Sequence, residues 1–269
     1  QYIPKTIKKK IILDMGDLYS KNYHQTYENL SYINPLKIIY FIESKIVEKY
    51  EKYCFEKANK ILLFSKSEIN LLKNKEKKKL VQIDFGVEKF KNFFKYEKKN
   101  FKILFIGNIN YTPNKKACFD FIEKILPKIK LIYPEIEFHI IGEVNEIDRY
   151  FLKKKNGVKI LGKVENLQPH LRKVICGIAN LNISTGVQTK ILTYMSYGIP
   201  CIASEKVFKN FDKIKNGSIC HYKNDQELIE LIIKLKEEKD FSKNLSKKSL
   251  KNIKYFLWKN VLKIFDKLI

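Results

Sequence analysis

The residues best suited to chemistry in this chain lie in one short segment, Ser184 to Pro200. An apolar run over 178–183 precedes the polar part of this segment and another over 199–203 follows it, so the pattern predicts a strand, a small polar turn, a helix and a second strand. The first N–H groups of a helix have no partner inside the helix, and the helix dipole is positive there, so such a turn binds anions. Lys190, one turn into the helix, would add a full charge; the alternative is that it is one more solvated lysine.

Three other predicted strands end in glycine, at Gly107, Gly142 and Gly162. A glycine in such a place either makes a turn or lets the backbone approach a ligand closely. Three such glycines at one edge of a sheet favour close approach to a ligand over three unrelated turns. In doubly wound sheets, ligands bind outside the carboxyl ends of the strands, at the point where the winding reverses.

The elements that must position these residues form two alternating series of strands and helices. In the first series, a strand over 8–13 leads into a turn, and residues 35–59 carry apolar side chains at helical spacing. Short strands follow over 61–65 and 81–87. This order of strands and helices predicts a parallel sheet.

A polar stretch over 90–100 is typical of a linker, and the second series follows it. Its predicted strands cover residues 102–107, 137–142, 158–162, 177–183 and 201–204. Its predicted helices cover residues 114–133, a short piece within 165–174, 225–237 and 245–269. The first of these helices is expected to be capped near Asn114. The order predicts a second doubly wound sheet.

The composition limits the classes of partner. The 269 residues suffice for one large or two ordinary domains, and the formal net charge is +24. Only Arg149 and Arg172 among the 53 basic residues are arginines. Nucleic-acid-binding proteins rely on arginine for bidentate contacts, so the lysine excess argues against nucleic acid. The excess of lysine is typical of solvated surfaces without a binding function. The functional alternative is attraction to anionic lipid headgroups.

The five cysteines are expected to be reduced thiols of a cytosolic protein, because they form no CxxC pair and no cluster with histidine. They are Cys54, Cys118, Cys176, Cys201 and Cys220. No run of eighteen apolar residues occurs, so no transmembrane helix is expected, and we recognise no signal peptide.

Four stretches of the chain resemble the group 1 retaining glycosyltransferases. Residues 105–114 (Phe-Ile-Gly-Asn-Ile-Asn-Tyr-Thr-Pro-Asn) resemble the opening strand and loop of their nucleotide-sugar domain, and 140–142 (Ile-Ile-Gly) resemble the next strand end. Residues 161–167 (Leu-Gly-Lys-Val-Glu-Asn-Leu) are similar to their base-binding loop, and 186–200 to their most diagnostic segment. The resemblance covers about residues 100–205. It implies an α/β GT-B fold, in which two Rossmann-like, doubly wound parallel sheets face a cleft.

The same resemblance suggests how the domains are divided. Residues 1–97 are similar to the second half of the acceptor-side domain, so this N-terminal domain is expected to be incomplete. Residues 98–244 would form the nucleotide-sugar-binding domain. Residues 245–269, with Trp258, resemble the C-terminal helix that crosses back to the N-terminal domain.

Roles for individual residues also follow from the resemblance. Gly107 and Asn108 would lie beside the diphosphate and the donor sugar. Val164 and the loop through Leu167 would contact the base, mostly through backbone atoms.

The phosphates would be bound at the start of the diagnostic helix. Gly186, Val187 and Gln188 would present N–H groups to them, and Lys190 would neutralise them. The resemblance implies no metal and no other cofactor, because the nucleotide-diphosphate sugar is itself the donor substrate. It identifies no catalytic group in this chain.

Two threonines depart from the family pattern. The family usually has two glutamates eight positions apart, of which the first contacts the donor sugar and the second holds the ribose hydroxyls; this chain has Thr185 and Thr193 there. Thr193 remains the candidate ribose contact, but a neutral hydroxyl is a weaker partner. Losing a charge-assisted hydrogen bond costs about 1.5–3 kcal/mol, or about tenfold to a hundredfold in affinity.

The sequence therefore predicts a retaining, hexosyltransferase-type glycosyltransferase. It would move a sugar from a nucleotide diphosphosugar to a glycan or lipid-linked acceptor in bacterial surface polysaccharide synthesis. We expect a cytoplasmic protein, peripheral at the inner membrane face, with an anionic membrane surface as a candidate partner. The two threonines leave an alternative: a catalytically impaired GT-B paralogue that acts as a binding or regulatory subunit.

Overall fold

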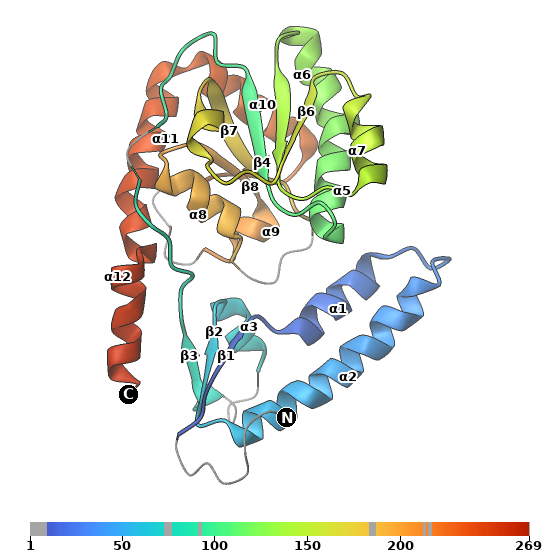
Figure 1. Ribbon diagram of the computed structural model, residues 1–269, viewed down its shortest axis with the longest axis vertical. Helices are drawn as coiled ribbons and strands as arrows, with labels where there is room; N and C mark the ends of the chain where they lie inside the picture. Colours follow the sequence, from blue (N-terminus) through green and yellow to red (C-terminus); the bar gives the residue numbers. More distant parts are fainter. Residues whose placement is uncertain are drawn as a thin grey trace. The chain divides into compact units, whose positions relative to one another are not determined.

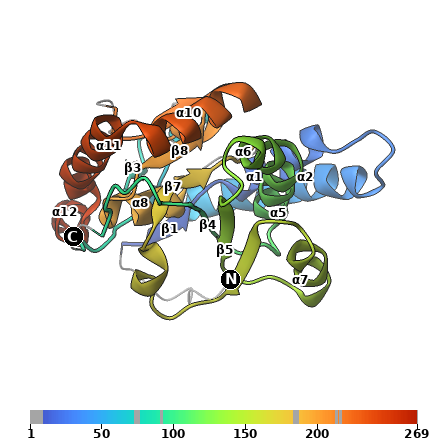
Figure 2. The same ribbon diagram turned by 90° about the horizontal axis from the view of Figure 1, so that it is seen from above.

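The computed structural model describes residues 10–72, 77–90, 93–182, 187–211, 214 and 217–268 (Figures 1 and 2). Two compact units make up this part of the chain. Unit 1 comprises the described residues of 1–84 together with Val187, and unit 2 comprises the rest. The domain limits predicted from the sequence, 1–97, 98–244 and 245–269, stay predictions.

Unit 1 is built on a small parallel sheet. Its strands lie side by side in the order β1-β2-β3 and are β1 (Ile12–Gly16), β2 (Lys60–Leu63) and β3 (Leu80–Gln82). The helices between them are α1 (Tyr19–Asn29), α2 (Leu36–Lys57) and α3 (Lys66–Leu71). Leu18, Phe55, Ile61 and Leu63 form its apolar core at the sheet.

The helix predicted over 35–59 is present as α2, but its polar face is the one that packs against α1. Lys37 donates from Nζ to the carbonyl of Leu30 (2.9 Å), and the hydroxyl of Ser20 donates to the carboxylate of Glu51 (2.5 Å). Lys37 and Glu51 are buried, whereas an apolar stripe on the opposite face is 50–57% exposed. We call this the outer stripe of α2; it consists of Ile39, Ile42, Ile46, Tyr50 and Tyr53.

Unit 2 contains six parallel strands in the spatial order β6-β5-β4-β7-β8-β9. Their bounds are β4 (Lys102–Ile106), β5 (Glu137–Ile141), β6 (Val158–Gly162), β7 (Val174–Ala179), β8 (Cys201–Ser204) and β9 (Cys220–Tyr222). This is the doubly wound order, with its winding reversal between β4 and β7. The apolar runs of the central strands β4, β5, β7 and β8 are buried on both faces, as is usual in parallel sheets.

Helices cover both faces of this sheet. They are α5 (Thr112–Asp120), α6 (Leu126–Ile132), α7 (Glu146–Lys153), α8 (Thr189–Ser196), α9 (Glu205–Phe208), α10 (Asp225–Glu237) and α11 (Lys239–Asn252). The short helix α12 (Trp258–Val261) follows them and contacts the 3₁₀ segments on either side of it. Helix α10 packs on α6, and α11 packs on α8. Figure 2 shows α10 and α11 running one after the other along one side of unit 2, with α7 at the opposite end beside β6.

The helix predicted over 114–133 is present in three pieces. A π-helical segment, Phe121–Ile125, separates α5 from α6. Pro127 explains the wider turn, because proline has no N–H to donate and its ring would clash with the carbonyl four residues earlier. The predicted cap is wrong: the residue before α5 is Tyr111, and the side chain of Asn114 points to a different part of the fold.

The strand predicted over 177–183 begins earlier, at Val174, and ends at Ala179. The short helix expected within 165–174 is a 3₁₀ turn over Gln168–Leu171. Asn180 follows the strand directly, and its side-chain amide donates to the carbonyl of Ala117 (2.7 Å). The five cysteines are free thiols, as predicted.

The last part of the chain is helical in short pieces and is joined to the start of unit 2. Val87 and Leu257 form a parallel bridge, in which the N–H of Trp258 donates to the carbonyl of Val87 (3.2 Å). A Cβ atom on Gly86 would lie 2.2 Å from the indole ring of Trp258. Glycine is therefore the residue that fits at position 86.

Candidate functional site

The three glycines predicted at one edge of the sheet meet there. The N–H of Gly107 donates to the carbonyl of Ile141 (2.9 Å), and the N–H of Gly142 donates to that of Gly162 (2.8 Å). A Cβ atom on Gly142 would lie 2.0 Å from the carbonyl oxygen of Gly107, and the φ angle of Gly142 is +143°. Gly142 is thus required by the backbone beside it, which is a packing role.

Gly107 has a different reason to be glycine. Its Cβ atom would lie 2.9 Å from Nδ2 of Asn114 and 3.3 Å from Nζ of Lys190. The missing side chain leaves room for these two polar groups just beyond the carboxyl end of β4. The groups that approach Gly107 closely are side chains of the protein itself, so a close approach to a ligand stays a prediction.

Lys190 is buried, so it is not one of the solvated lysines. Only 5% of it is exposed. Its Nζ donates to Oδ1 of Asn114 (2.7 Å) and lies 3.8 Å from the centre of the Phe105 ring. An ammonium over an aromatic face is attracted by the ring quadrupole.

The protonation of Lys190 is sensitive to its surroundings. Burial lowers the pKa of Lys190 to about 7, and Cys118 nearby acts weakly in the opposite direction. A buried charge costs free energy unless it is paired. An anion arriving at this ammonium would therefore raise its pKa and hold the proton.

Helix α8 carries Lys190 in its first turn. Gln188 is its N-cap in an extended conformation and makes no side-chain capping bond, and the first turn contains no acid. Val187 directly precedes Gln188 and is half-buried, whereas Gly186 and Thr185 lie outside the described residues. The described start of α8 therefore has the electrostatic character of an anion site.

Tyr194, which the sequence interpretation missed, fixes the position of α8. Its hydroxyl accepts from the N–H of Ile106 (2.9 Å) and lies 3.2 Å from the carbonyl of Leu104. Its ring occupies the space above Gly177, where a Cβ atom would lie 2.5 Å from the ring. A glycine inside a buried strand was the signal that could have revealed this close approach.

Asn108 organises the loop between β4 and α5. Its Oδ1 accepts from the N–H of Asn110 (2.8 Å), its Nδ2 donates to Glu143 (3.2 Å), and its carbonyl accepts from Nδ2 of Asn114 (2.9 Å). Glu143 also lies 4.0 Å from Nζ of Lys163. The predicted residues Gly107, Asn108 and Lys190 are thus brought together, and Asn114 is the contact between them that sequence reasoning missed.

Val164 and Leu167 lie in the loop after β6, and both are half-buried. The carbonyl of Leu167 accepts from the N–H of His170 (2.9 Å) in the 3₁₀ turn. Strand β6, which this loop follows, is two strands from β4, so the ends of these two strands are about 10 Å apart, two strand spacings. Thr193 is half-buried on α8, and its hydroxyl donates to the carbonyl of Thr189 (3.1 Å).

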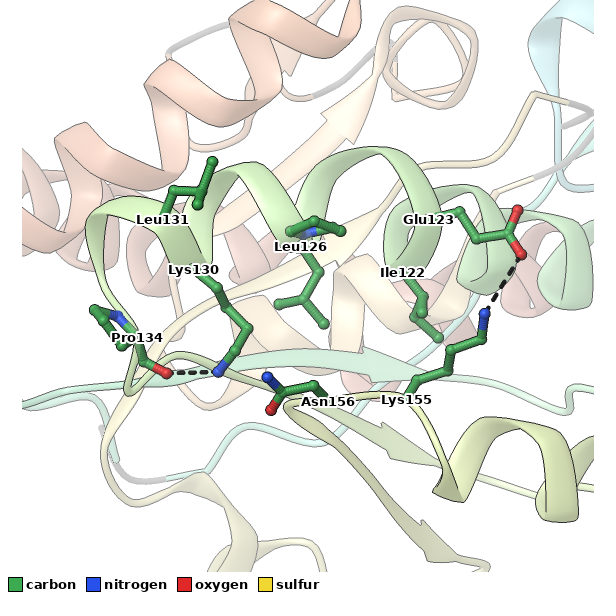
Figure 3. Close-up of a pocket in the computed structure, with 9 residues that line it drawn as sticks. Ile122, Glu123, Leu126, Lys130, Leu131, Pro134, Lys155 and Asn156 are labelled. Carbon is green, nitrogen blue, oxygen red and sulfur yellow. Dashed lines mark hydrogen bonds and ion pairs between the residues drawn. The ribbon is translucent and has the colours of Figure 1, made fainter.

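A hollow of about 740 Å³ lies elsewhere in unit 2, between α6 and the turn before β6 (Figure 3). At its rim Lys130 donates to the carbonyl of Pro134 (2.5 Å), and Lys155 pairs with Glu123 (4.0 Å). Pro134 and Asn156 precede β5 and β6, so the hollow is at the amino ends of these strands. Gly107 and Gly142 lie at the opposite edge of the sheet, at the carboxyl ends of β4 and β5. The hollow is therefore no part of the candidate site.

Comparison with known proteins gave a family match for most of unit 2. A sequence profile described as "Glycosyl transferases group 1" matches residues 100–238, more than half of the chain. No curated protein matches.

Many solved structures are similar to this chain. A mutant of S. aureus TarM, crystallised with UDP among other ligands, has a TM-score of 0.66 at 15% identity, with 83% of this chain and 46% of TarM covered. Anabaena HepE in complex with UDP-glucose has a TM-score of 0.68 at 11% identity, with 97% of this chain and 72% of HepE covered. WaaG, a glycosyltransferase involved in lipopolysaccharide biosynthesis, has a TM-score of 0.67 at 9% identity, with 95% of this chain and 74% of WaaG covered. The fold is GT-B as predicted, and the chain spans about half the length of TarM.

Proposed function

This chain belongs to the group 1 glycosyl transferases, and from that premise we propose that it moves a sugar from a nucleotide diphosphosugar to an acceptor hydroxyl with retention. The observation that carries the proposal is the buried ammonium of Lys190, which lies beside Gly107 in the first turn of α8. A buried cation at a helix N-terminus is suited to a diphosphate. The bond that breaks joins the anomeric carbon to the diphosphate, which leaves as part of a nucleoside diphosphate.

In this proposal the charge that develops on the leaving diphosphate is stabilised by the protein. Lys190 supplies a full charge, and the start of α8 supplies the positive end of its dipole. The N–H groups of Val187 and Gln188, and that of Gly186 outside the described residues, would add hydrogen bonds. Gly107 and Asn108 border the diphosphate and the sugar. The proposal includes no metal ion.

Val164 and Leu167 would contact the base, and Thr193 the ribose. The separation of about 10 Å between strands β6 and β4 leaves room for a ribose between base and diphosphate. The hydrogen of the Thr193 hydroxyl is used by Thr189, so its oxygen is left to accept from a ribose hydroxyl.

Calorimetric titration with UDP tests the proposal, followed by turnover of UDP-sugars. Lys190→Met should lower the affinity for UDP by about tenfold to a hundredfold, because a charge-assisted hydrogen bond is lost. Lys116→Met, which removes an exposed lysine of α5, is the matched control. If the wild-type protein bound neither UDP nor any nucleotide sugar, or if Lys190→Met bound as well as wild type, the proposal would be wrong.

We further propose a glycan or lipid-linked acceptor in surface polysaccharide synthesis, and a cytoplasmic protein that meets an anionic membrane surface peripherally. No helix in the described ranges is long and apolar enough to span a bilayer. The outer stripe of α2 supports the membrane contact, since it exposes isoleucines and tyrosines. Lys45, Lys49 and Lys52 follow one border of this stripe, and each lysine near an anionic surface adds up to about 1 kcal/mol.

Sedimentation with lipid vesicles checks the membrane contact. Vesicles containing phosphatidylglycerol should bind the wild-type protein, with weaker binding in high salt. The double variant Ile42→Ser and Ile46→Ser should bind at least about tenfold more weakly, because apolar surface is lost. Ile132→Ser, an exposed position in unit 2, is the control. Unchanged vesicle binding by the double variant would refute the membrane contact. If the wild-type protein were a dimer and the double variant a monomer, the outer stripe would instead be a contact with a second copy of the chain.

The alternative function is a GT-B paralogue that binds or regulates without efficient catalysis. Thr193 favours it, because its short neutral side chain replaces the glutamate expected at the ribose. Nucleotide binding without turnover of any donor would support this alternative.

A further inference from the structure

Asn114 joins two parts of the site that are distant in sequence. Its Oδ1 accepts from Nζ of Lys190 on α8 (2.7 Å), and its Nδ2 donates to the carbonyl of Asn108 in the β4–α5 loop (2.9 Å). Asn114 is 9% exposed. Both of its polar atoms therefore have partners in the interior of unit 2.

The chemistry of the two partners fixes which way the amide points. An ammonium only donates and a carbonyl only accepts, so the oxygen of Asn114 must face Lys190 and its nitrogen must face Asn108. An aspartate would keep the first contact and lose the second. A leucine of similar size would lose both.

The ammonium of Lys190 is held on two sides. Asn114 accepts one of its hydrogens, and the ring of Phe105 lies 3.8 Å away on another side. Gly107 provides the space, since a Cβ atom there would lie 3.3 Å from Nζ. A lysine side chain held in this way loses little further freedom when an anion binds, and preorganised charge binds more tightly.

No carboxylate among the described residues forms an ion pair with Lys190. The titratable group that affects the pKa of Lys190 is the thiol of Cys118 on α5, and Tyr194 lies one turn further along α8. Burial raises the pKa of both groups far enough to keep them neutral around pH 7. Asn114 is therefore the polar neighbour through which the charge of Lys190 can be altered by substitution.

We propose that Asn114 is a positioning residue, which holds the ammonium of Lys190 in place for the diphosphate and favours its charged form. The inference rests on the proposed function for the identity of the anion. Its effect on Lys190 itself is independent of any nucleotide. Asn114 acts through Lys190 and needs no contact with the sugar or the phosphates.

Two substitutions separate this role from a merely structural one. Asn114→Leu removes the acceptor, so the pKa of Lys190 should fall by about one unit; Asn114→Asp places a negative charge beside it, so that pKa should rise by at least as much. NMR of protein labelled with ¹³C-lysine follows the titration of Lys190 Cε, which lies apart from the other lysines because it occurs near pH 7. Lys190→Arg assigns the signal.

UDP is the ligand probe in the same experiment. Both Asn114 variants should bind UDP about tenfold more weakly at pH 7. In Asn114→Leu the ammonium of Lys190 is no longer held in place, and in Asn114→Asp the new carboxylate offsets its positive charge. Asn100→Leu is the matched control: Asn100 is 4% exposed and donates to backbone carbonyls at the other end of β4. It should lower the melting temperature without changing the pKa of Lys190 or the affinity for UDP.

The outcomes keep the two proposals apart. Opposite shifts of the Lys190 titration in the two variants support the role of Asn114. Shifts in the same direction, or none, overturn it even if UDP binds. Failure of the wild-type protein to bind UDP or any nucleotide sugar overturns the proposed function, while the titration still decides whether Asn114 controls Lys190.

Discussion

The ring of Tyr194 lies on Gly177, where a Cβ atom would be 2.5 Å from its Cγ, and the hydroxyl of Tyr194 reaches across to β4. One side chain thereby fixes α8 relative to two adjacent strands. The start of α8 carries Lys190, so the position of the buried charge depends on this contact.

Tyr194→Phe should destabilise unit 2 by about 1–3 kcal/mol, because the N–H of Ile106 would be buried without a partner. Gly177→Ala should destabilise it further, since either the ring or the strand must move. Urea unfolding measures both, with Tyr255→Phe, at an exposed tyrosine, as the control. Wild-type stability of Tyr194→Phe would show that this hydroxyl does not support α8.

The affinity for UDP should fall as the pH rises above about 7. The pKa of Lys190 is about 7 in the free protein, and a bound diphosphate raises it, so binding takes up a proton at higher pH. The affinity for UDP is at its maximum below the pKa that Lys190 has in the free protein, and it falls by up to about tenfold per pH unit above that pKa. Calorimetry between pH 7.5 and 9.5 tests this, and Lys190→Arg, which stays charged, should show a flat profile. A flat wild-type profile would contradict the prediction.

Glu68 should make the stability of unit 1 depend on pH. Burial, and then the charge of Asp17, raise the pKa of Glu68 to about 8, and its Oε1 accepts from the N–H of Leu18 (3.2 Å). The folded pKa lies above the ordinary value of 4.5, so stability is complete below pH 4.5 and is lost as the pH rises towards 8.

Glu68→Gln keeps the oxygen that accepts from Leu18 and cannot ionise. It should therefore be more stable than wild type by over about 1 kcal/mol at pH 9, and similar to wild type at pH 5. Thermal unfolding at the two pH values measures the difference. Glu28→Gln, at an exposed glutamate, should change little at either pH. Equal behaviour of Glu68→Gln and wild type at pH 9 would refute the raised pKa.

Thr193→Glu should increase the affinity for nucleotide by about tenfold to a hundredfold, because a carboxylate accepts more strongly from ribose hydroxyls. Thr193→Gln, of equal length but neutral, should gain less. Affinities for UDP from calorimetry make the comparison. A gain without any turnover of donor would favour the paralogue, and no gain in either variant would remove Thr193 from the ribose site.

The sequence was sufficient to predict the sheet of unit 2 and several of the residues that meet at the carboxyl ends of its strands. Gly107, Gly142 and Lys190 were found because strand-end glycines and a lysine in the first turn of a helix have a local pattern. Asn114 was not found, because an asparagine near a helix start resembles a cap, and its partners lie on another helix and an earlier loop. Contacts between distant segments leave no local pattern to read.

Helix α2 shows a second limit. Its periodicity predicted the helix and its apolar stripe correctly, but periodicity does not say which face packs inward. Burial of Glu51 against Ser20 decided the orientation, and this polar contact joins two different helices. Periodicity alone therefore did not show that the outer stripe lies on the surface.

Gly86 and Trp258 carry a consequence for evolution. The indole ring fills the volume that any side chain at position 86 would need, so a larger residue there requires the ring to move or to be replaced by a smaller side chain. Homologues with a larger residue at position 86 should have a smaller one at position 258. The first and last parts of unit 2 are thus sterically coupled, although they lie at opposite ends of its sequence.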